Sequence, residues 1–249
     1  MSYLSMWMVP GSKVNREHNL FVSESKHLFV DAKGDVKYQK KPLDRRTCGG
    51  RKILTRLVVL DIDSGALYGE YHDDSTAMQF DDFLLRAWHP KAGHYFRGVP
   101  NKLNVPAKII DSTQNMSLVR SIADPAGVEA YDVLPSGFAA GVHALRGFEQ
   151  KVMSQLSRNE PLSLHVVQVL SALLSYMATP SAYAQPDGWD NVTALPVAAK
   201  QAVQSRYGED YWCTGPFERI FPPVLRDASD MSCLRTVDLM KLSRPSKSE

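Results

Sequence analysis

The sequence predicts a mixed α/β fold, and two observations support this class. Between residues 27 and 158, segments with strand character alternate with helical ones, in the order strand, strand hairpin, helix, strand, helix, strand, helix. Beyond residue 159 only helical patterns follow. We therefore expect a sheet with helices on both faces. The chain divides into an N-terminal arm (1–26), an α/β core (27–158) and a mainly helical C-terminal extension (159–249).

Three strands are expected in the first part of the core. Residues 27–31 are apolar and end at Asp31, whereas residues 53–62 form a β-branched run typical of a buried central strand. A turn at Asp63 and Gly65 leads into a returning strand over 66–71. The strongly basic segment between the first two strands is expected to project as an extended hairpin.

Helices and strands then alternate to the end of the core. A helix is expected from Ser75 or Thr76 to Trp88, because either hydroxyl can cap it and Pro90 ends it. The remaining predictions are a strand over 107–110 ending at Asp111, a helix over 116–123 stopped by Asp124 and Pro125, a strand over 128–134, a helix over 138–156, and helices over 162–177 and 197–206.

Composition excludes several classes of protein. The 29 basic and 27 acidic residues nearly balance, so net charge alone does not indicate a nucleic-acid binder. The 3 cysteines lie far apart without a C-x-x-C spacing, which argues against a zinc site or a disulfide framework. No apolar run reaches the roughly 18 residues of a membrane span. We expect a soluble, cytoplasmic protein.

Two aspartates follow predicted strands. Asp31 follows Leu28 to Val30, and Asp111 follows Lys108 to Ile110. Carboxylates that meet at one sheet edge bind hard cations such as Mg²⁺ or Mn²⁺, and two such ions stabilise the attacking and leaving oxygens in phosphodiester chemistry. An aspartate after a strand is also ordinary turn chemistry. Asp61, at the end of the core strand, is a rival first ligand.

Residues 25–155 resemble the catalytic core of DDE transposases and retroviral integrases. The resemblance rests on the strand order, on Leu28-Phe29-Val30-Asp31 in the first strand, and on Asp111-Ser112-Thr113-Gln114-Asn115-Met116, where Thr113 replaces the glycine of the family. It implies an RNase H-like mixed five-stranded sheet. It also implies Asp31 and Asp111 as catalytic, metal-binding residues, with a glutamate on a later helix as the third carboxylate.

The third carboxylate has two candidate positions. Matched on Gly141, the place of the glutamate is taken by Ala144, whereas matched on spacing it falls on Glu149. Five helical positions separate the two residues by about 140° around the axis, so both cannot face the same metals. Activity as a polynucleotidyl transferase or nuclease therefore depends on whether Glu149 completes the site.

The basic segment 33–56 is the expected DNA contact. Its lysines and arginines outnumber its acids, and such residues bind the phosphate backbone without reading sequence. The alternative is a solvated hairpin that blunts a sheet edge. The predicted DNA-binding residues are Lys37, Lys40, Lys41, Arg45, Arg46, Arg51 and Lys52.

These observations define the functional hypotheses. The first is an integrase- or transposase-like protein of a mobile element, with metal-dependent cleavage or strand transfer on DNA. The alternative is a catalytically degenerate relative that binds DNA or a partner protein in a regulatory or assembly role, which Thr113 and Ala144 favour. A stand-alone RNase H-like nuclease also needs the third acid. The expected partners are DNA, a separate DNA-binding or transposition subunit, and further copies of the chain.

Overall fold

The computed structural model describes residues 16–44, 48–73, 80–89, 96–134, 139–156 and 162–178, together with Val197 and Gln201. Its elements are, in chain order, β1 (Glu17–Val30), β2 (Asp35–Tyr38), β3 (Lys52–Asp61), β4 (Leu67–His72), α1 (Phe80–Trp88), β5 (Lys102–Val105), α2 (Ala107–Ile110), α3 (Thr113–Ala126), β6 (Ala130–Val133), α4 (Ala139–Leu156), β7 (Leu162–Ser163) and α5 (Leu164–Ala178). None of the helices in these ranges is sufficiently long and apolar to cross a membrane.

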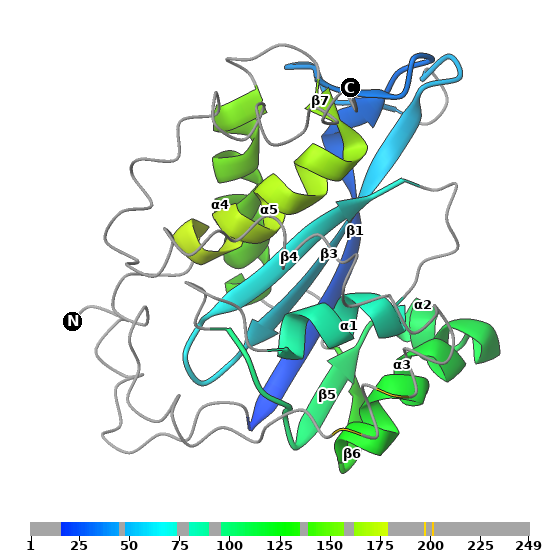
Figure 1. Cartoon of the computed structure of the whole chain (residues 1–249), viewed down its shortest axis with the longest axis vertical. Coiled ribbons are helices and arrows are strands. Elements are labelled where there is room, and N and C mark those ends of the chain that lie inside the picture. Colours follow the sequence, from blue (N-terminus) through cyan, green and yellow to red (C-terminus); the bar gives the residue numbers. More distant parts are fainter. Residues whose placement is uncertain are drawn as a thin grey trace, which may run out of the picture.

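The strands form one mixed sheet (Figure 1). Five of them pair antiparallel in the order β4-β3-β1-β2-β7 and curl into a half-barrel. Two more are parallel: β5 pairs with β1, and β6 pairs with β5. The predicted mixed α/β class is therefore confirmed.

The long strand β1 has different neighbours along its length. Its first part lies between β3 and β5, where Glu17 to Asn19 pair with Lys102 to Asn104. Its last part lies between β3 and β2, where Leu28 to Val30 pair with Val36 to Tyr38. The register shifts between Glu24 and Phe29, so a β-bulge separates the two parts.

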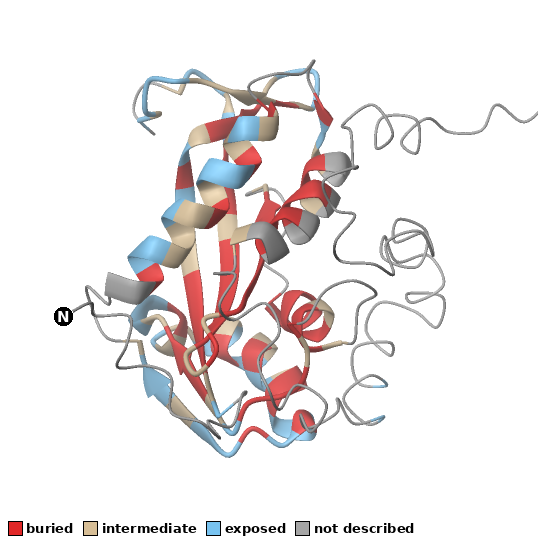
Figure 2. Ribbon diagram, turned by 90° about the vertical axis from the view of Figure 1, so that its left-hand side faces the viewer, coloured by how far each residue is buried: buried red, intermediate tan, exposed pale blue. Residues whose placement is uncertain are grey.

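Helices cover both faces of the sheet, and a hydrophobic core lies under each set (Figure 2). Leu20 points to the core formed with α1 and α3, and its neighbour Phe21 points to the core formed with α4 and α5, as strand alternation requires. Gly141 lets α4 lie close to the sheet, because a Cβ there would collide with the ring of Phe21.

Several predicted elements are confirmed, with modest changes in their bounds. The strands over 53–62, 66–71 and 128–134 correspond to β3, β4 and β6, and the helices over 138–156 and 162–177 to α4 and α5. The first predicted strand is too short. β1 begins at Glu17, so residues 17–26, which we expected in the N-terminal arm, lie in the sheet. The polar residues His18 and Asn19 hid this part of the strand in the sequence, but their side chains are buried against neighbouring strands.

The predicted strand over 107–110 is wrong. These residues form the short helix α2, and the strand lies earlier, as β5. The β-branched Ile109 and Ile110 favoured a strand, but Pro106 lacks an amide hydrogen, ends β5 and stands at the N-cap of α2. Asp111 therefore follows a helix and not a strand.

The helix predicted over 116–123 is longer than expected. α3 runs from Thr113 to Ala126, with Pro125 inside its last turn. The helix ends at Gly127, whose φ of 91° places it in the left-handed region that closes helices. The predicted helix start at Ser75 or Thr76, and most of the helix over 197–206, lie outside the described residues.

Candidate functional site

Asp31 lies in the turn between β1 and β2. Its Oδ1 accepts hydrogen bonds from the amides of Lys33 (2.9 Å) and Asp35 (3.0 Å), and its Oδ2 lies 2.5 Å from Nζ of Lys37. The hydrogen bond from Lys37 makes the largest contribution to lowering the pKa of Asp31, and the two backbone hydrogen bonds make smaller ones. The carboxylate therefore closes the hairpin turn.

Asp111 lies beyond the end of β5, away from Asp31. It is exposed and caps α2, where its amide donates to the Ala107 carbonyl (2.8 Å). α2 directly follows β5, which pairs with β1 only from Glu17 to Asn19. Asp31 follows the last residue of β1, so the two carboxylates are separated by most of this strand at about 3.3 Å per residue.

Glu149 joins α4 to the sheet. One carboxylate oxygen accepts a hydrogen bond from Ser25 Oγ (2.8 Å), and the other pairs with the guanidinium of Arg56 on β3. Ser25 Oγ also accepts from the amide of Leu28 (3.0 Å), which fixes the bulge in β1. We call Ser25, Arg56 and Glu149 the bulge clamp. Ala144, the other candidate position, packs against the core under α4 and α5.

The three predicted catalytic carboxylates are thus not brought together. Asp31 belongs to the hairpin, Asp111 to the end of α2, and Glu149 to the bulge clamp. Across the ranges the structure describes, no group of three or more His, Cys, Asp or Glu side chains is placed to hold a metal ion.

Asp61, the rival ligand, is fully buried at the β3–β4 turn. Its Oδ2 accepts from the amide of Ser64 (3.1 Å), and its Oδ1 lies 3.9 Å from Nε2 of His18. Nε1 of Trp88 donates to Nδ1 of His18 (3.2 Å). Burial lowers the pKa of His18 to about 3, so the ring is neutral near neutral pH. These contacts give Asp61 a structural role in the turn.

Two asparagines occupy the place where β1 and β5 run side by side. Asn19 and Asn104 face each other in register and are 1% and 2% exposed. Nδ2 of Asn104 donates to Oδ1 of Asn19 (2.6 Å) and to Oε1 of Glu17 (2.5 Å), while its own Oδ1 is buried without a hydrogen-bond partner. We call Asn19 and Asn104 the amide pair.

A lysine balances the acids around the amide pair. Nζ of Lys102 lies 3.7 Å from a carboxylate oxygen of Glu17 and 3.3 Å from one of Asp132 on β6. Two divalent ions need several anionic oxygens, whereas here Asn19 and Asn104 are neutral and both nearby carboxylates are paired with Lys102. The residues present therefore do not fit the metal pair that the sequence resemblance implies.

Sequence reasoning missed the amide pair for definable reasons. Asn19 falls in the range assigned to the N-terminal arm, and Asn104 precedes the predicted strand at 107–110. The available signal was a pair of polar residues, His18 and Asn19, directly before the apolar run that begins at Leu20.

A second buried ion network fixes α1 against β4. Arg86 donates two hydrogen bonds to Glu70, both 2.8 Å, and also pairs with Asp82 one helical turn earlier. Tyr68 donates its hydroxyl hydrogen to Glu70. Although burial opposes it, the pairing with Arg86 and His72 keeps the pKa of Glu70 below its usual value.

The predicted DNA-binding residues fall into two groups. In the first group, Lys37 pairs with Asp31, and Lys52 lies 3.9 Å from Asp73. Arg51 donates to the Cys48 carbonyl (2.7 Å) and lies over the ring of Phe29, 5.0 Å from its centroid. These side chains have internal partners. Arg45 and Arg46 lie outside the described residues.

The second group is exposed. Lys40 and Lys41 follow β2, and two lysines outside the predicted set, Lys26 and Lys33, lie on the same hairpin. The amide of Leu43 donates to the Lys26 carbonyl (2.6 Å), which holds the segment after β2 beside β1. None of the four forms an ion pair with a described residue. We call Lys26, Lys33, Lys40 and Lys41 the hairpin lysines.

Comparison with known proteins adds no relative to this picture. No protein-family model matches the chain, and no curated protein has a significantly similar sequence. The function of the chain is therefore inferred from the amide pair, the bulge clamp and the hairpin lysines.

Proposed function

We propose that this chain is an RNase H-like protein of the integrase and transposase type that binds DNA through the hairpin lysines without cutting it. The observation that carries the proposal is the amide pair at the junction of β1 and β5. This is the catalytically degenerate alternative among the hypotheses drawn from the sequence.

The order of the elements supports the assignment of the fold. β1, β3 and β4 are connected antiparallel neighbours, and β5 and β6 are then added parallel to β1, each after a helix. α1 and α3 cover one face of this sheet, and α4 and α5 cover the other. The sequence resemblance implies a mixed sheet with helices on both faces, but it implies five strands, and here β2 and β7 bring the sheet to seven.

The chemistry of the strand junction supports loss of catalysis. Cleavage by a metal pair requires carboxylates that approach from separate elements. Where β1 and β5 pair, the facing residues Asn19 and Asn104 bear no charge, and the carboxylate of Glu17 is paired with Lys102. Glu149 is neutralised by Arg56 at the bulge, so it is committed to packing α4 on the sheet.

The hairpin lysines support binding to a polyanion. A lysine that neutralises a DNA phosphate releases condensed counterions, and this gain does not depend on base sequence. Lys40 and Lys41 keep their charges available because no described carboxylate pairs with them, in contrast to Lys37. The proposed contact is therefore smaller than the predicted one and includes Lys26 and Lys33.

Metal-dependent cleavage or strand transfer by Asp31, Asp111 and Glu149 stays a prediction. It requires these three side chains to converge, whereas each has a separate place among the described residues. A rearrangement that united them would have to break both the bulge clamp and the hairpin turn.

The two functions are separated by a combined binding and cleavage assay. The full chain is mixed with a labelled DNA duplex at about 50 mM salt, with and without Mg²⁺ or Mn²⁺. We expect retardation of the duplex without cleavage, and weaker retardation for Lys40→Ala/Lys41→Ala than for the matched control Lys37→Ala. Cleavage that Asp31→Asn or Asp111→Asn abolishes would establish the enzyme, and absence of retardation would refute DNA binding.

A further inference from the structure

Within the part of the chain that the structure describes, the outer edge of β6 is open. β6 pairs with β5 on one side, and no other strand of the described chain pairs with it. The amides of Ala130 and Leu134 donate to carbonyls on the β5 side, so strand alternation turns the backbone groups of Tyr131 and Val133 outward. The side chain of Val133 is 49% exposed. An edge of this kind is a template for another strand.

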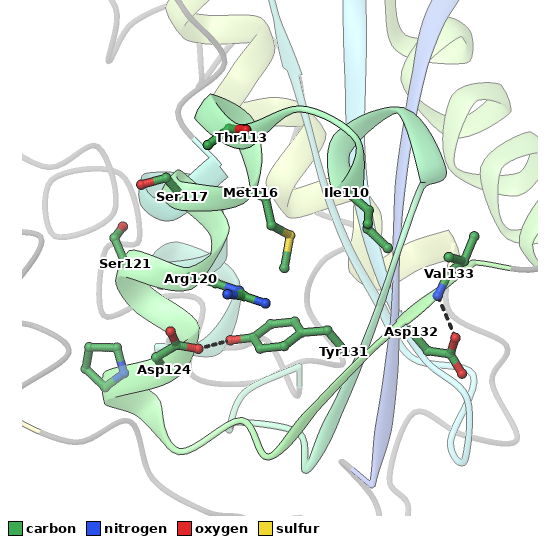
Figure 3. A pocket seen from close by; sticks show the side chains of 11 residues that line it. Ile110, Thr113, Met116, Ser117, Arg120, Ser121, Asp124, Tyr131, Asp132 and Val133 are labelled. Atoms are coloured by element: carbon green, nitrogen blue, oxygen red, sulfur yellow. Dashed lines mark hydrogen bonds between the residues drawn. The ribbon is translucent and has the colours of Figure 1, made fainter.

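A groove runs along the same edge, between α3 and β6 (Figure 3). Its volume is about 900 Å³, and Ile110, Met116 and Val133 supply apolar walls. The guanidinium of Arg120 lies over the ring of Tyr131, 5.4 Å from its centroid, and the Tyr131 hydroxyl bonds to Asp124. A side chain from an added strand would meet this apolar surface beside β6.

Charge distinguishes between the possible occupants of the edge. Asp132 accepts a hydrogen bond from the outward amide of Val133 (2.7 Å). If two copies of β6 paired antiparallel through Tyr131 and Val133, Asp132 would stand opposite its own symmetry mate. Like charges directly opposite one another destabilise a strand pair. The edge is therefore unfavourable for a second copy. Lys102 contacts one oxygen of Asp132 from within the sheet, but the Asp132 side chain is 61% exposed and can still meet a basic residue of another strand.

We propose that β6 accepts an extended segment of a partner protein, which adds a strand beside Tyr131 and Val133. Main-chain hydrogen bonds supply the attachment, as in other cases of strand addition, and a carbonyl of the added strand replaces Oδ1 of Asp132 on the amide of Val133. The segment places an apolar side chain over the groove and a lysine or arginine opposite Asp132. This site lies at the edge of the sheet formed by β6, whereas the hairpin lysines lie on the β1–β2 hairpin, so the proposal is independent of DNA binding.

The test uses two capped peptides that alternate valine with lysine, or valine with glutamate, in equal length. Binding of each fluorescent peptide to the full chain is measured by anisotropy, and protection of residues 129–134 by hydrogen exchange. We expect the lysine peptide to bind about fivefold more tightly, the scale of a cross-strand charge pair. Asp132→Lys should reverse this preference, because the side chain is 61% exposed and its replacement leaves the core intact.

A second variant tests the main-chain part of the proposal. Val133→Pro removes the outward amide and should weaken both peptides at least tenfold, while far-UV circular dichroism verifies that the fold is retained. Three results would overturn the proposal: no protection of 129–134 by either peptide, an unchanged preference in Asp132→Lys, or self-association of the native chain through β6. If the proline variant does not fold, the charge reversal alone decides the outcome.

Discussion

Polar residues occur at both parts of β1, but they are used in opposite ways. In the first part, His18 and Asn19 are buried between β3 and β5, whereas Glu17 is 36% exposed, and the side-chain hydrogen bonds of all three end within the protein. In the last part, β2 is the neighbour, and the lysines of that hairpin face solvent. The bulge clamp separates these regions. The neighbouring strands, more than the residue types, therefore determine whether a polar group stabilises the fold or remains available to a partner.

The largest expected effect on stability comes from breaking the bulge clamp, which separates the two parts of β1. Glu149→Ala leaves the part-buried Arg56 without its counter-charge, and we expect a loss of about 3 kcal/mol of unfolding free energy, the low end of the range for buried pairs, because both side chains keep some exposure (12% and 13%). Urea unfolding measures the loss. The matched control, Glu129→Ala at an exposed position, should change it by less than about 0.5 kcal/mol. Equal stability of the two variants would show that the clamp does not hold α4.

The enclosed part predicts a pH dependence. The pKa of His18 is about 3 in the folded chain, against 6.5 for a free histidine. Between these values the unfolded chain binds a proton that the folded chain does not, so stability falls by a few kcal/mol as the pH is lowered from about 6.5 to 3. His18→Gln keeps an acceptor for Trp88 but cannot titrate, and it should flatten this part of the stability curve. An unchanged curve would contradict a neutral, buried His18.

Substitution of the hairpin lysines should have the smallest effect on stability and the largest effect on DNA binding. Lys40→Ala/Lys41→Ala should leave the free energy of unfolding within about 0.5 kcal/mol of the native value. The slope of log affinity for duplex DNA against log salt should fall by about 0.9 for each phosphate that the variant no longer neutralises. Lys37→Ala serves as the control, since Lys37 is paired with Asp31. Identical slopes for the two variants would exclude the hairpin lysines as the DNA-binding surface.

Periodicity sufficed for much of the fold. The β-branched run at 53–62 and the helical pattern over 138–156 predicted β3 and α4 near their observed places. Local signals failed where a single backbone constraint outweighed side-chain preference. Pro106 ends β5 and starts a helix that contains Ile109 and Ile110, and α3 continues past Pro125 until the left-handed Gly127 ends it.

The candidate site was less predictable, because its members come from distant segments. Nothing local to Asn19 indicates that Asn104 will lie beside it, since that contact depends on the parallel pairing of β1 with β5. Likewise, the sequence does not reveal that Glu149 meets Arg56 or that Lys37 meets Asp31. Residue type suggested metal ligands and DNA contacts, and pairing across the fold assigned structural roles to several of them.

The central claim is that amides stand at the strand junction where a metal-dependent enzyme would need carboxylates. Calorimetric titration with Mn²⁺ tests it on the native chain and on Asn19→Asp/Asn104→Asp, with the exposed Asn101→Asp as a control for added charge. We predict no saturable Mn²⁺ binding by the native chain or by the control. The double variant should be less stable without metal, because it buries two facing carboxylates, and it should gain one Mn²⁺ site whose occupation restores its stability. Saturable Mn²⁺ binding by the native chain that Asp31→Asn and Asp111→Asn both abolish would contradict the account.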